Sequence, residues 1–474
     1  MAEVEVSNIT YSKFIDRYQS VQIPDYQRPY RWNKDKVKDL LDDLKAFFMD
    51  KPDSNLDYYM GGILLYHNQA AKCYEVVDGQ QRLTTLHLIS FVLTNVLQEG
   101  QNLQYNNHIS FYHIKENHKY LMEQIELLKR LSEQDFFSKL VFTLIISQDE
   151  DQSFAFFDSQ NNRGVSLAAD DYLKAYHLRE ITSESLQSNL AEQWEQAAIK
   201  AQNEMNIERG LLHLFYKILY RSRQWKGQSN IVPESKDQII NSFQKETIKA
   251  HGSSYRLFKS KDNVKFSEIT LNENDEIEPL TTTELQFEKA ERLPFSIRQP
   301  LYKGLNFFQF TQKYYAIHQM LFYGRHHEDA QILKARCFYD AVYDSNMSEY
   351  LRHYMQLCLV LFYDTFGNLE IDKAVQYFDY FIGSIRIEKY YVRQEAIKNS
   401  LMLEVDNNLL DVIAHSYLPE EVFDFISGQK HVKDIYEKEN LKPDNGVRYK
   451  YKGRVISFYG KNEDRLSNRL EWIR

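Results

Sequence analysis

The sequence predicts an α+β protein in which a small mixed sheet near the N-terminus is followed by a large, mostly α-helical region. Short alternating and β-branched segments occur within the first 150 residues, and this pattern is typical of half-buried strands. Apolar residues at helical spacing dominate from about residue 185 to residue 440. The predicted strands are residues 58–67, 73–77 and 142–146, and the clearest predicted helices are residues 209–219, 307–321, 349–366, 371–387 and 393–403.

Three segments of the chain differ in pattern, and we expect them to be separate parts of the structure. Residues 1–185 contain the predicted sheet, and residues 186–440 form the helical region. Residues 441–474 combine a small basic hairpin with a final helix. The hairpin is predicted from the alternation of V-R-Y-K-Y-K-G-R-V-I-S-F-Y at residues 447–459, which contains a Lys-Gly turn pair.

Composition excludes several classes of protein. The net charge is −9, so any contact with nucleic acid needs a local basic face. Three cysteines without a CxxC pair are too few for a disulfide scaffold, which predicts a reducing, cytoplasmic location. The N-terminus lacks a basic-then-apolar signal, and no window reaches the roughly 18 apolar residues of a membrane span. We therefore expect no membrane insertion.

A proline-stiffened segment, V-Q-I-P-D-Y-Q-R-P-Y-R-W, occupies residues 21–32. Pro24 and Pro29 disfavour helix at their own positions and at the residue before each, so we expect this segment to be extended. Asn33 is then expected to cap a helix over residues 34–48. The extended segment would present six polar and aromatic side chains: Tyr26, Gln27, Arg28, Tyr30, Arg31 and Trp32.

The stretch Y-E-V-V-D-G-Q-Q-R-L-T-T-L-H-L at residues 74–88 predicts a strand, a tight turn and a helix. A helix N-terminus offers unpaired N–H groups and a partial positive charge, which suit an anion such as phosphate. Gly79 would let a ligand approach the backbone, and Arg82 could form two hydrogen bonds to phosphate oxygens. Asp78 could hold a hydrated divalent cation or orient a water. The alternative is a plain strand-to-helix turn with Asp78 as its N-cap.

A second informative stretch covers residues 153–178. Its first half is predicted to be an apolar helix that ends at Asn162-Arg163, with Gly164 after its last turn. A second helix is predicted to begin at Ser166 or Leu167. By pattern alone, the favoured interpretation is that Asn162 and Arg163 are solvated residues at a helix end.

Two clusters, Q-R-P-Y-R-W at residues 27–32 and D-G-Q-Q-R at residues 78–82, combine amides with arginines. If the fold brings them together, Arg28 and Arg82 would contact phosphates, while the amides of Gln27, Gln80 and Gln81 would contact polar edges. An aromatic side chain could stack on a base. The candidates for stacking are Tyr26, Tyr30 and Trp32.

No Walker A, H-E-x-x-H, G-x-S-x-G or dinucleotide fingerprint occurs in the sequence. The one histidine cluster is His326-His327-Glu328, and adjacent residues on a helix point in different directions, which is poor for one metal ion. His415 has no neighbouring acid. The histidines therefore favour no catalytic or metal site.

The motifs resemble, in order and spacing, those of a known family. The runs I-P-D-Y-Q-R-P-Y-R-W, Y-Y-M-G-G-I-L-L and Y-E-V-V-D-G-Q-Q-R-L-T-T-L resemble the N-terminal domain of GmrSD- and SspE-type prokaryotic defence proteins, a member of the ParB/sulfiredoxin-like superfamily. The later run F-F-D-S-Q-N-N-R-G-V-S-L-A-A-D-D-Y-L-K resembles the asparagine-arginine-glycine segment of the same family. The resemblance covers about residues 5–180. It implies a nucleotide-binding, nucleotide-hydrolysing module that regulates DNA restriction in anti-phage defence.

The resemblance also implies residue roles for a nucleoside triphosphate and a divalent cation, most simply Mg²⁺. Asp78 would serve the metal or the attacking water, and Arg82 would contact the phosphates as the second catalytic residue. Asp171 would support the pocket. The implied nucleotide-binding residues are Gln27, Arg28, Tyr30, Gly79, Gln80, Gln81, Thr84, Asn162, Arg163 and Lys174.

One departure from the family bears on nuclease activity. Members that cut DNA usually carry a C-terminal HNH-type nuclease domain, recognised by an acid-histidine pair followed by a proline. No E-H-x-x-P run occurs here, and His415 precedes Pro419 without the acid. We therefore expect this chain to be the nucleotide-sensing half of a split system in which a partner subunit supplies the nuclease, or a variant whose helical C-terminal region binds a partner. Two alternatives stay open: a non-catalytic module that binds DNA or a partner protein, and a metal-dependent endonuclease.

Overall fold

The computed structural model describes residues 4–50, 56–97, 103–105, 108–149, 152–153, 168–205, 210–228, 231–249, 254–263, 266–271, 277–282, 289–323, 329–343, 347–402, 406–463 and 465–473. The chain divides into two compact units, Met1–Glu195 and Gln196–Arg474.

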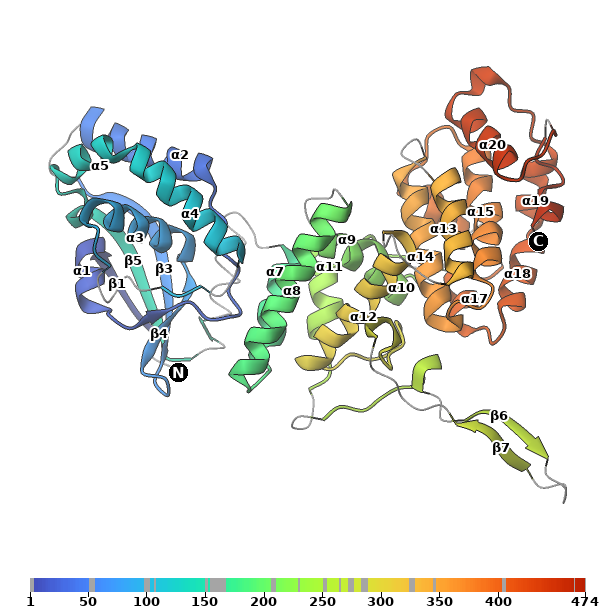
Figure 1. Cartoon of the computed structure of the whole chain (residues 1–474), viewed down its shortest axis with the longest axis horizontal. Coiled ribbons are helices and arrows are strands. Elements are labelled where there is room, and N and C mark those ends of the chain that lie inside the picture. Colours follow the sequence, from blue (N-terminus) through green and yellow to red (C-terminus); the bar gives the residue numbers. More distant parts are fainter. Residues whose placement is uncertain are drawn as a thin grey trace. The chain divides into compact units, whose positions relative to one another are not determined.

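The N-terminal unit is built on a five-stranded mixed sheet with the strand order β1-β5-β3-β4-β2 (Figure 1). The central strand β3 runs parallel to β5 and antiparallel to β4. At the edges, β1 is antiparallel to β5, and the short β2 is parallel to β4. The predicted mixed sheet is therefore confirmed. The strands are β1 (Val4–Thr10), β2 (Val21–Gln22), β3 (Tyr58–Asn68), β4 (Cys73–Asp78) and β5 (Leu140–Ser147).

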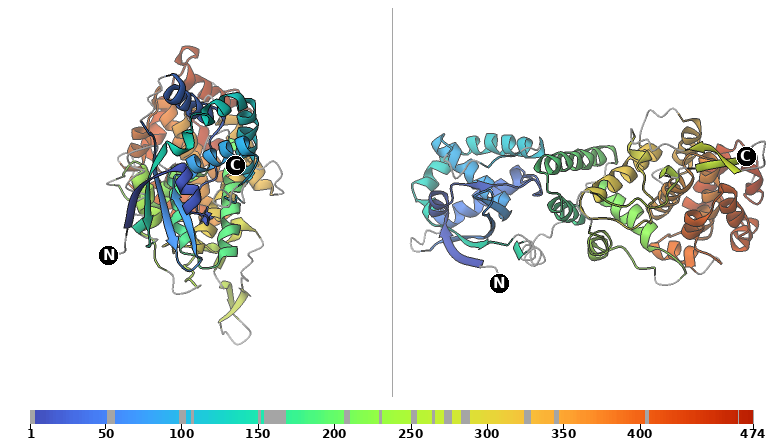
Figure 2. Two further views of the ribbon diagram at one scale, coloured as in Figure 1. Left: turned by 90° about the vertical axis from the view of Figure 1, so that its left-hand side faces the viewer. Right: turned by 90° about the horizontal axis from the view of Figure 1, so that it is seen from below.

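Helix α3 (Gln80–Thr94) is the buried centre of the helical layer that covers this sheet (Figures 1 and 2). Leu83, Leu86 and Ile89 have no exposed surface and pack into one core with the apolar side chains of the strands. Because α3 is buried on most sides, core packing fixes the position of its first turn. The other helices of the layer are α1 (Tyr11–Arg17), α2 (Lys34–Lys45), α4 (His108–Glu123) and α5 (Ile125–Ser132).

The start of helix α2 was predicted correctly from the local sequence. Asn33 caps α2 as predicted, since its side chain accepts a hydrogen bond from the Lys36 N–H at 3.1 Å. Two further described helices of this unit are α7 (Ala169–Arg179) and α8 (Glu184–Met205), and α8 continues past Glu195. The helix predicted to end at Asn162-Arg163, and the predicted start at Ser166 or Leu167, lie outside the described residues.

The C-terminal unit is mostly helical, as predicted, and α14 (Glu349–Phe366) and α15 (Ile371–Glu388) are its most deeply buried helices (Figure 1). A small antiparallel hairpin is formed by β6 (Phe266–Leu271) and β7 (Ile277–Thr282). No described helix is both long and apolar enough to span a membrane. The remaining α-helices are α9 (Gly210–His213), α10 (Tyr220–Gln224), α11 (Lys236–Ile240), α12 (Leu305–Phe322), α13 (Ala330–Val342), α16 (Gln394–Met402), α17 (Leu409–His415), α18 (Pro419–Ser427), α19 (Lys430–Glu437) and α20 (Val447–Phe458).

The hairpin predicted at residues 447–459 is wrong, because this segment forms the helix α20. Tyr451 and Val455, four residues apart, are buried on one face of the helix. Lys452 is buried beside them and its Nζ lies 2.9 Å from Glu439 Oε1. The alternating sequence suits either structure, and this tertiary packing decides for the helix. The predicted final helix is reduced to a short 3₁₀ turn, η9 (Arg469–Trp472).

A buried polar network ties α20 and η9 to α15. Asp379 forms a fully buried ion pair with Arg469, and the Tyr343 hydroxyl donates to Asp379 Oδ1 at 2.7 Å. The Tyr451 hydroxyl also donates to Asp379, at 3.1 Å. Gly383 lies one turn further along α15, and a Cβ there would overlap the Tyr451 hydroxyl. The network therefore depends on a residue without a side chain at position 383.

We predict that Gly383→Ala lowers the free energy of unfolding by about 1–3 kcal/mol, because the added methyl group overpacks a closed polar network. The matched control is Gly453→Ala in α20, where a Cβ would meet no atom within 4 Å. This control should raise stability by up to about 1 kcal/mol through helix propensity. Urea titration followed by circular dichroism checks both variants. Equal destabilisation by the two would contradict the packing argument.

Three buried histidines meet elsewhere in the C-terminal unit. The His213 ring centroid lies 4.5 Å from that of His353 and 5.7 Å from that of His318. Burial lowers the pKa of His213 to about 4, of His318 to about 3 and of His353 to about 2, with nearby cationic side chains adding to the effect at His213 and His353. The described residues contain no group of His, Cys, Asp and Glu side chains arranged to hold a metal ion. With these lowered pKa values, the three imidazoles are uncharged near neutral pH.

We predict that this cluster makes stability fall as the pH drops. Each folded-state pKa lies below the value of about 6.5 in an unfolded chain, so below pH 6.5 the unfolded state binds more protons. The free energy of unfolding should fall by roughly 1.4 kcal/mol per pH unit for each histidine between about pH 6 and pH 4.5. Urea midpoints across this range should show a smaller slope in His318→Asn than in the wild type. His415→Gln, which removes an exposed imidazole from α17, should keep the wild-type slope.

Candidate functional site

The turn between β4 and α3 has an unusual backbone. Gly79 has φ +95°, a left-handed conformation that glycine adopts without steric cost, and no side chain caps α3. Asp78 is therefore not the N-cap of a plain turn. Its side chain is 42% exposed, and its Oδ2 lies 3.7 Å from Arg82 Nη2 one helical turn later. The first turn of α3 thus has N–H groups without a side-chain cap, and the ion pair of Asp78 and Arg82 lies next to them.

Arg82 is held against the central strand. Its Nη1 donates to the Met60 carbonyl at 2.7 Å, and the guanidinium lies over Gly61, where a Cβ would overlap it. Gly61 has φ +92°, and the register between β3 and β5 shifts between Tyr59 and Gly62. Gly61 therefore gives the Arg82 side chain room to approach the strand backbone closely.

The side chain of Gln81 joins the two sequence clusters directly. Its Oε1 accepts from the N–H groups of Arg31 at 2.8 Å and Trp32 at 3.1 Å, and its Nε2 donates to the Pro29 carbonyl at 3.0 Å. A second connection runs from Gln27 Nε2 to the Val77 carbonyl at 2.7 Å. The proline-stiffened segment and the Asp-Gly-Gln-Gln-Arg turn therefore lie side by side, as the site requires.

Tyr30 is fully buried, so its ring has no surface on which a base could stack. Its hydroxyl is paired with Thr85 Oγ1 at 2.8 Å and accepts from Asn117 Nδ2 at 2.9 Å. Burial raises the pKa of Tyr30, and these two hydrogen bonds oppose the rise. We therefore revise its role from stacking partner to positioning residue for the extended segment.

Gln80 and Thr84 contact a residue that the sequence did not single out, Tyr105. The Thr84 hydroxyl pairs with the Tyr105 hydroxyl and donates to the Gln80 carbonyl at 2.8 Å. Burial raises the pKa of Tyr105 to about 12, and the side chains of Thr84 and Gln80 partly oppose the rise. The Gln80 side chain is 4% exposed, and neither of its amide atoms makes a well-formed hydrogen bond within the described residues.

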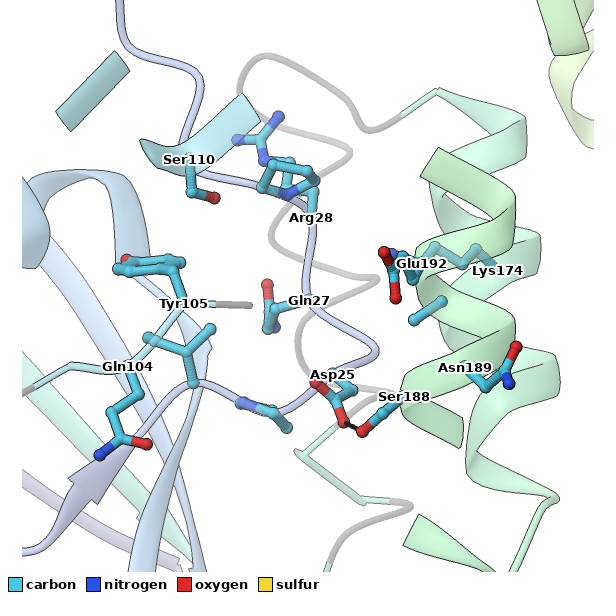
Figure 3. Close-up of a pocket in the computed structure, with 14 residues that line it drawn as sticks. Asp25, Gln27, Arg28, Gln104, Tyr105, Ser110, Lys174, Ser188, Asn189 and Glu192 are labelled. Atoms are coloured by element: carbon cyan, nitrogen blue, oxygen red, sulfur yellow. Dashed lines mark hydrogen bonds between the residues drawn. The ribbon is translucent and has the colours of Figure 1, made fainter. Parts of the chain in front are cut away.

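A cavity of about 410 Å³ opens beside the extended segment (Figure 3). Its size is in the range of sites for small organic ligands. In Figure 3, Asp25 lies beside Ser188 of α8, whose hydroxyl donates to it, whereas the Gln27 side chain points toward Tyr105. The lining residues are Ile23, Pro24, Asp25, Gln27, Arg28, Pro29, Gln104, Tyr105, Ser110, Lys174, Ser188, Asn189, Ala191 and Glu192.

Lys174 belongs to a buried charge cluster behind this wall. Its side chain is 3% exposed, and its Nζ donates to Glu195 Oε1 at 2.9 Å. The other carboxylate oxygen of Glu195 accepts from Arg31 Nη2 at 3.3 Å. Glu195 therefore connects the extended segment, α7 and α8 through one carboxylate.

The structure brings some predicted site residues together and separates others. Gln27, Arg28 and Lys174 line the cavity, whereas Asp78 and Arg82 do not. The Asp78–Arg82 pair adjoins the cavity through Val77, to which Gln27 is bonded. Asp171 is half-buried in the first turn of α7. Asn162 and Arg163 lie outside the described residues.

Sequence reasoning missed several residues of the site. Asp25 stands inside the quoted motif and was detectable there as an acid between two prolines. Asn117, Tyr105 and Glu195 carry no local signal, because each reaches the site from a segment distant in sequence.

With this geometry established, comparison with known proteins identifies the class of the chain. Residues 11–178 match the family model described as the GmrSD restriction endonuclease, N-terminal domain. The chain is therefore a component of a GmrSD-type restriction system of anti-phage defence, as the motifs predict.

A second match covers residues 186–443, more than half of the chain, and it is to the Family of unknown function (DUF7834). The chain belongs to this family. No curated protein matches the chain.

The Gln81 contacts give a prediction on the site. Gln81→Ala leaves two N–H groups and one carbonyl without their partner, so stability should fall by about 1–3 kcal/mol. The amides of Arg31 and Trp32 should exchange with deuterium faster, which NMR or mass spectrometry measures. Gln80→Ala is the matched control, since the Gln80 side chain does not bond these amides. Unchanged protection of both amides in Gln81→Ala would contradict the assigned contacts.

Proposed function

We propose that this protein is the nucleotide-sensing component of its restriction system: it binds a nucleoside triphosphate, hydrolyses it slowly with a divalent cation, and so gates DNA cleavage by a partner nuclease subunit. The observation that carries the proposal is the side chain of Gln81, which joins the two amide- and arginine-rich clusters beside a cavity of suitable size.

The chemistry of the cavity supports a phosphorylated ligand. Arg28 and Lys174 supply cationic N–H donors to the cavity, and Gln27 adds an amide whose Nε2 donates to the Val77 carbonyl. Lys174 makes one hydrogen bond among the described residues and can donate three. A ligand with several phosphate oxygens would satisfy the remaining donors.

We assign hydrolysis to the ion pair of Asp78 and Arg82, which adjoins the cavity. A water oxygen attacks the terminal phosphorus as the bond to the bridging oxygen breaks, and inorganic phosphate and a nucleoside diphosphate leave. Asp78 is exposed enough to orient that water, and Arg82 has N–H groups beyond those held by Met60 to stabilise charge on the phosphate. The N-terminus of α3, which has no side-chain cap, adds a partial positive charge at the same turn.

The divalent cation would be held at this site by the Asp78 carboxylate. Asp78 is the one predicted metal ligand, and Mg²⁺ is commonly bound by one or two carboxylates together with substrate phosphates and waters. Asp78 would thus hold a cation that arrives with the nucleotide, and the cation would neutralise charge on the phosphates.

We predict a separation of binding from turnover. Asp78→Asn and Arg82→Ala should reduce the rate of nucleotide hydrolysis by about a hundredfold or more, because each removes a group that acts on the transferred phosphate. Arg28→Ala should instead weaken binding about tenfold through loss of one charge-assisted contact. Phosphate release and calorimetric titration measure the two effects.

Asp42→Asn, which removes an exposed carboxylate from α2, is the control and should match the wild type in both assays. Hydrolysis that persists in Asp78→Asn and Arg82→Ala would remove the catalytic assignment. Binding of a DNA duplex without binding of any nucleotide, with an affinity that falls steeply with salt, would favour the non-catalytic DNA-binding alternative.

A further inference from the structure

The cavity wall is shared by the two matched regions of the chain. The extended segment and Lys174 belong to the residues that match the GmrSD N-terminal domain, whereas Ser188, Asn189 and Glu192 belong to the region of unknown function. All of these residues lie within the N-terminal unit. The first helix of the family of unknown function, α8, is therefore part of the candidate ligand site.

Among the described residues in and behind the wall, cationic and anionic side chains are equal in number. Three cations, Arg28, Arg31 and Lys174, stand beside three carboxylates, which are Asp25, Glu192 and Glu195. A polyphosphate that entered would need these cations, and two of them are now bonded to Glu195. An anion that binds must therefore replace Glu195 as the partner of these cations. The replacement is favourable only if the new ion pairs are lower in free energy than the old ones.

Two of the three carboxylates, Glu192 and Glu195, stand on α8, almost one helical turn apart. A polyphosphate would repel both of them and would also compete for the lysine that holds α8 against α7. Lys174 and Glu195 are 3% and 4% exposed, so solvent screens this competition little. The element whose attachment changes with the ligand is thus α8, which runs on to Met205.

We propose that a nucleoside triphosphate in this cavity takes Lys174 from Glu195, and that α8 is the element that responds to occupancy of the site. The inference rests on the proposed function for the identity of the ligand and adds to it the residues that transmit binding. Glu195 is a positioning residue in this scheme, since it acts through Lys174 and Arg31. In this chain, the region that matches the family of unknown function accordingly begins with the helix that senses ligand binding.

Hydrogen–deuterium exchange of the full chain, measured beside calorimetric titration, tests the proposal. The probes are ATP, GTP, CTP and UTP, each with magnesium chloride, and inorganic tripolyphosphate as a ligand with charge but no base. A probe that binds should speed exchange in peptides from α8 by about threefold or more, because the helix loses an ion pair, while peptides from α5 stay unchanged.

A probe that binds calorimetrically without changing exchange in α8 would overturn the inference and leave the proposed function intact. Failure of all five probes to bind would overturn both.

Glu195→Gln provides a second test with a readout that a purely structural residue would not give. The neutral amide keeps the shape of the side chain but holds Lys174 and Arg31 less strongly, so the bound probe should bind about tenfold more tightly. Exchange in α8 without ligand should approach the ligand-bound level of the wild type. Glu126→Gln, which removes an exposed carboxylate from α5, should bind as the wild type does. Weaker binding of the probe by Glu195→Gln would contradict the proposal that the ligand takes Lys174 from Glu195. If this variant does not fold, the hydrogen–deuterium exchange of the wild type with and without the probe decides.

Discussion

The N-terminal unit depends on the position of one buried amide, that of Gln81. Its oxygen and nitrogen together satisfy two backbone N–H groups and one carbonyl in a segment that two prolines keep out of regular structure. A buried loop without such partners would carry unpaired polar groups, each with a cost of about 1–3 kcal/mol. The amide can do this because core packing of α3 against the sheet holds its first turn in place. The hydrophobic core thus fixes the polar site through a short chain of hydrogen bonds.

The same arrangement explains how one small turn can serve two purposes. Gly79 allows the left-handed backbone that directs the first turn of α3 toward the extended segment, and Gly61 leaves room for Arg82 against β3. Asp78 stays partly exposed beside that arginine. One side of the turn therefore holds structure together, while the other presents an acid and a base to solvent. The partly exposed pair of Asp78 and Arg82 would then act on a phosphate while neighbouring groups of the cavity bind the ligand.

The boundary between the two matched regions lies next to the site. Their matches end at residue 178 and begin at residue 186, yet Lys174 and Glu195 form one buried ion pair across that boundary. A buried charge without its partner is costly in free energy. The positions of α7 and α8 therefore depend on each other through this ion pair. A ligand that alters either charge acts on the other. The C-terminal unit has buried polar groups of its own, around Asp379 and in the three-histidine cluster, which rest on packing within that unit.

The sequence by itself determined the class of fold, the three central strands β3, β4 and β5, and the two clusters of the candidate site. It did so because these features are local: strand alternation, helical spacing, the cap at Asn33 and the Asp-Gly turn each depend on residues close together in sequence. The tertiary structure alone decided the burial of Tyr30, the contribution of Tyr105 and Glu195, and the helix at residues 447–458. Each of these depends on contacts between residues far apart in sequence, such as those of Tyr451 with Asp379 and of Glu195 with Arg31. Local patterns carry no information about such partners, and their packing energy exceeds the small differences in propensity on which prediction from sequence rests.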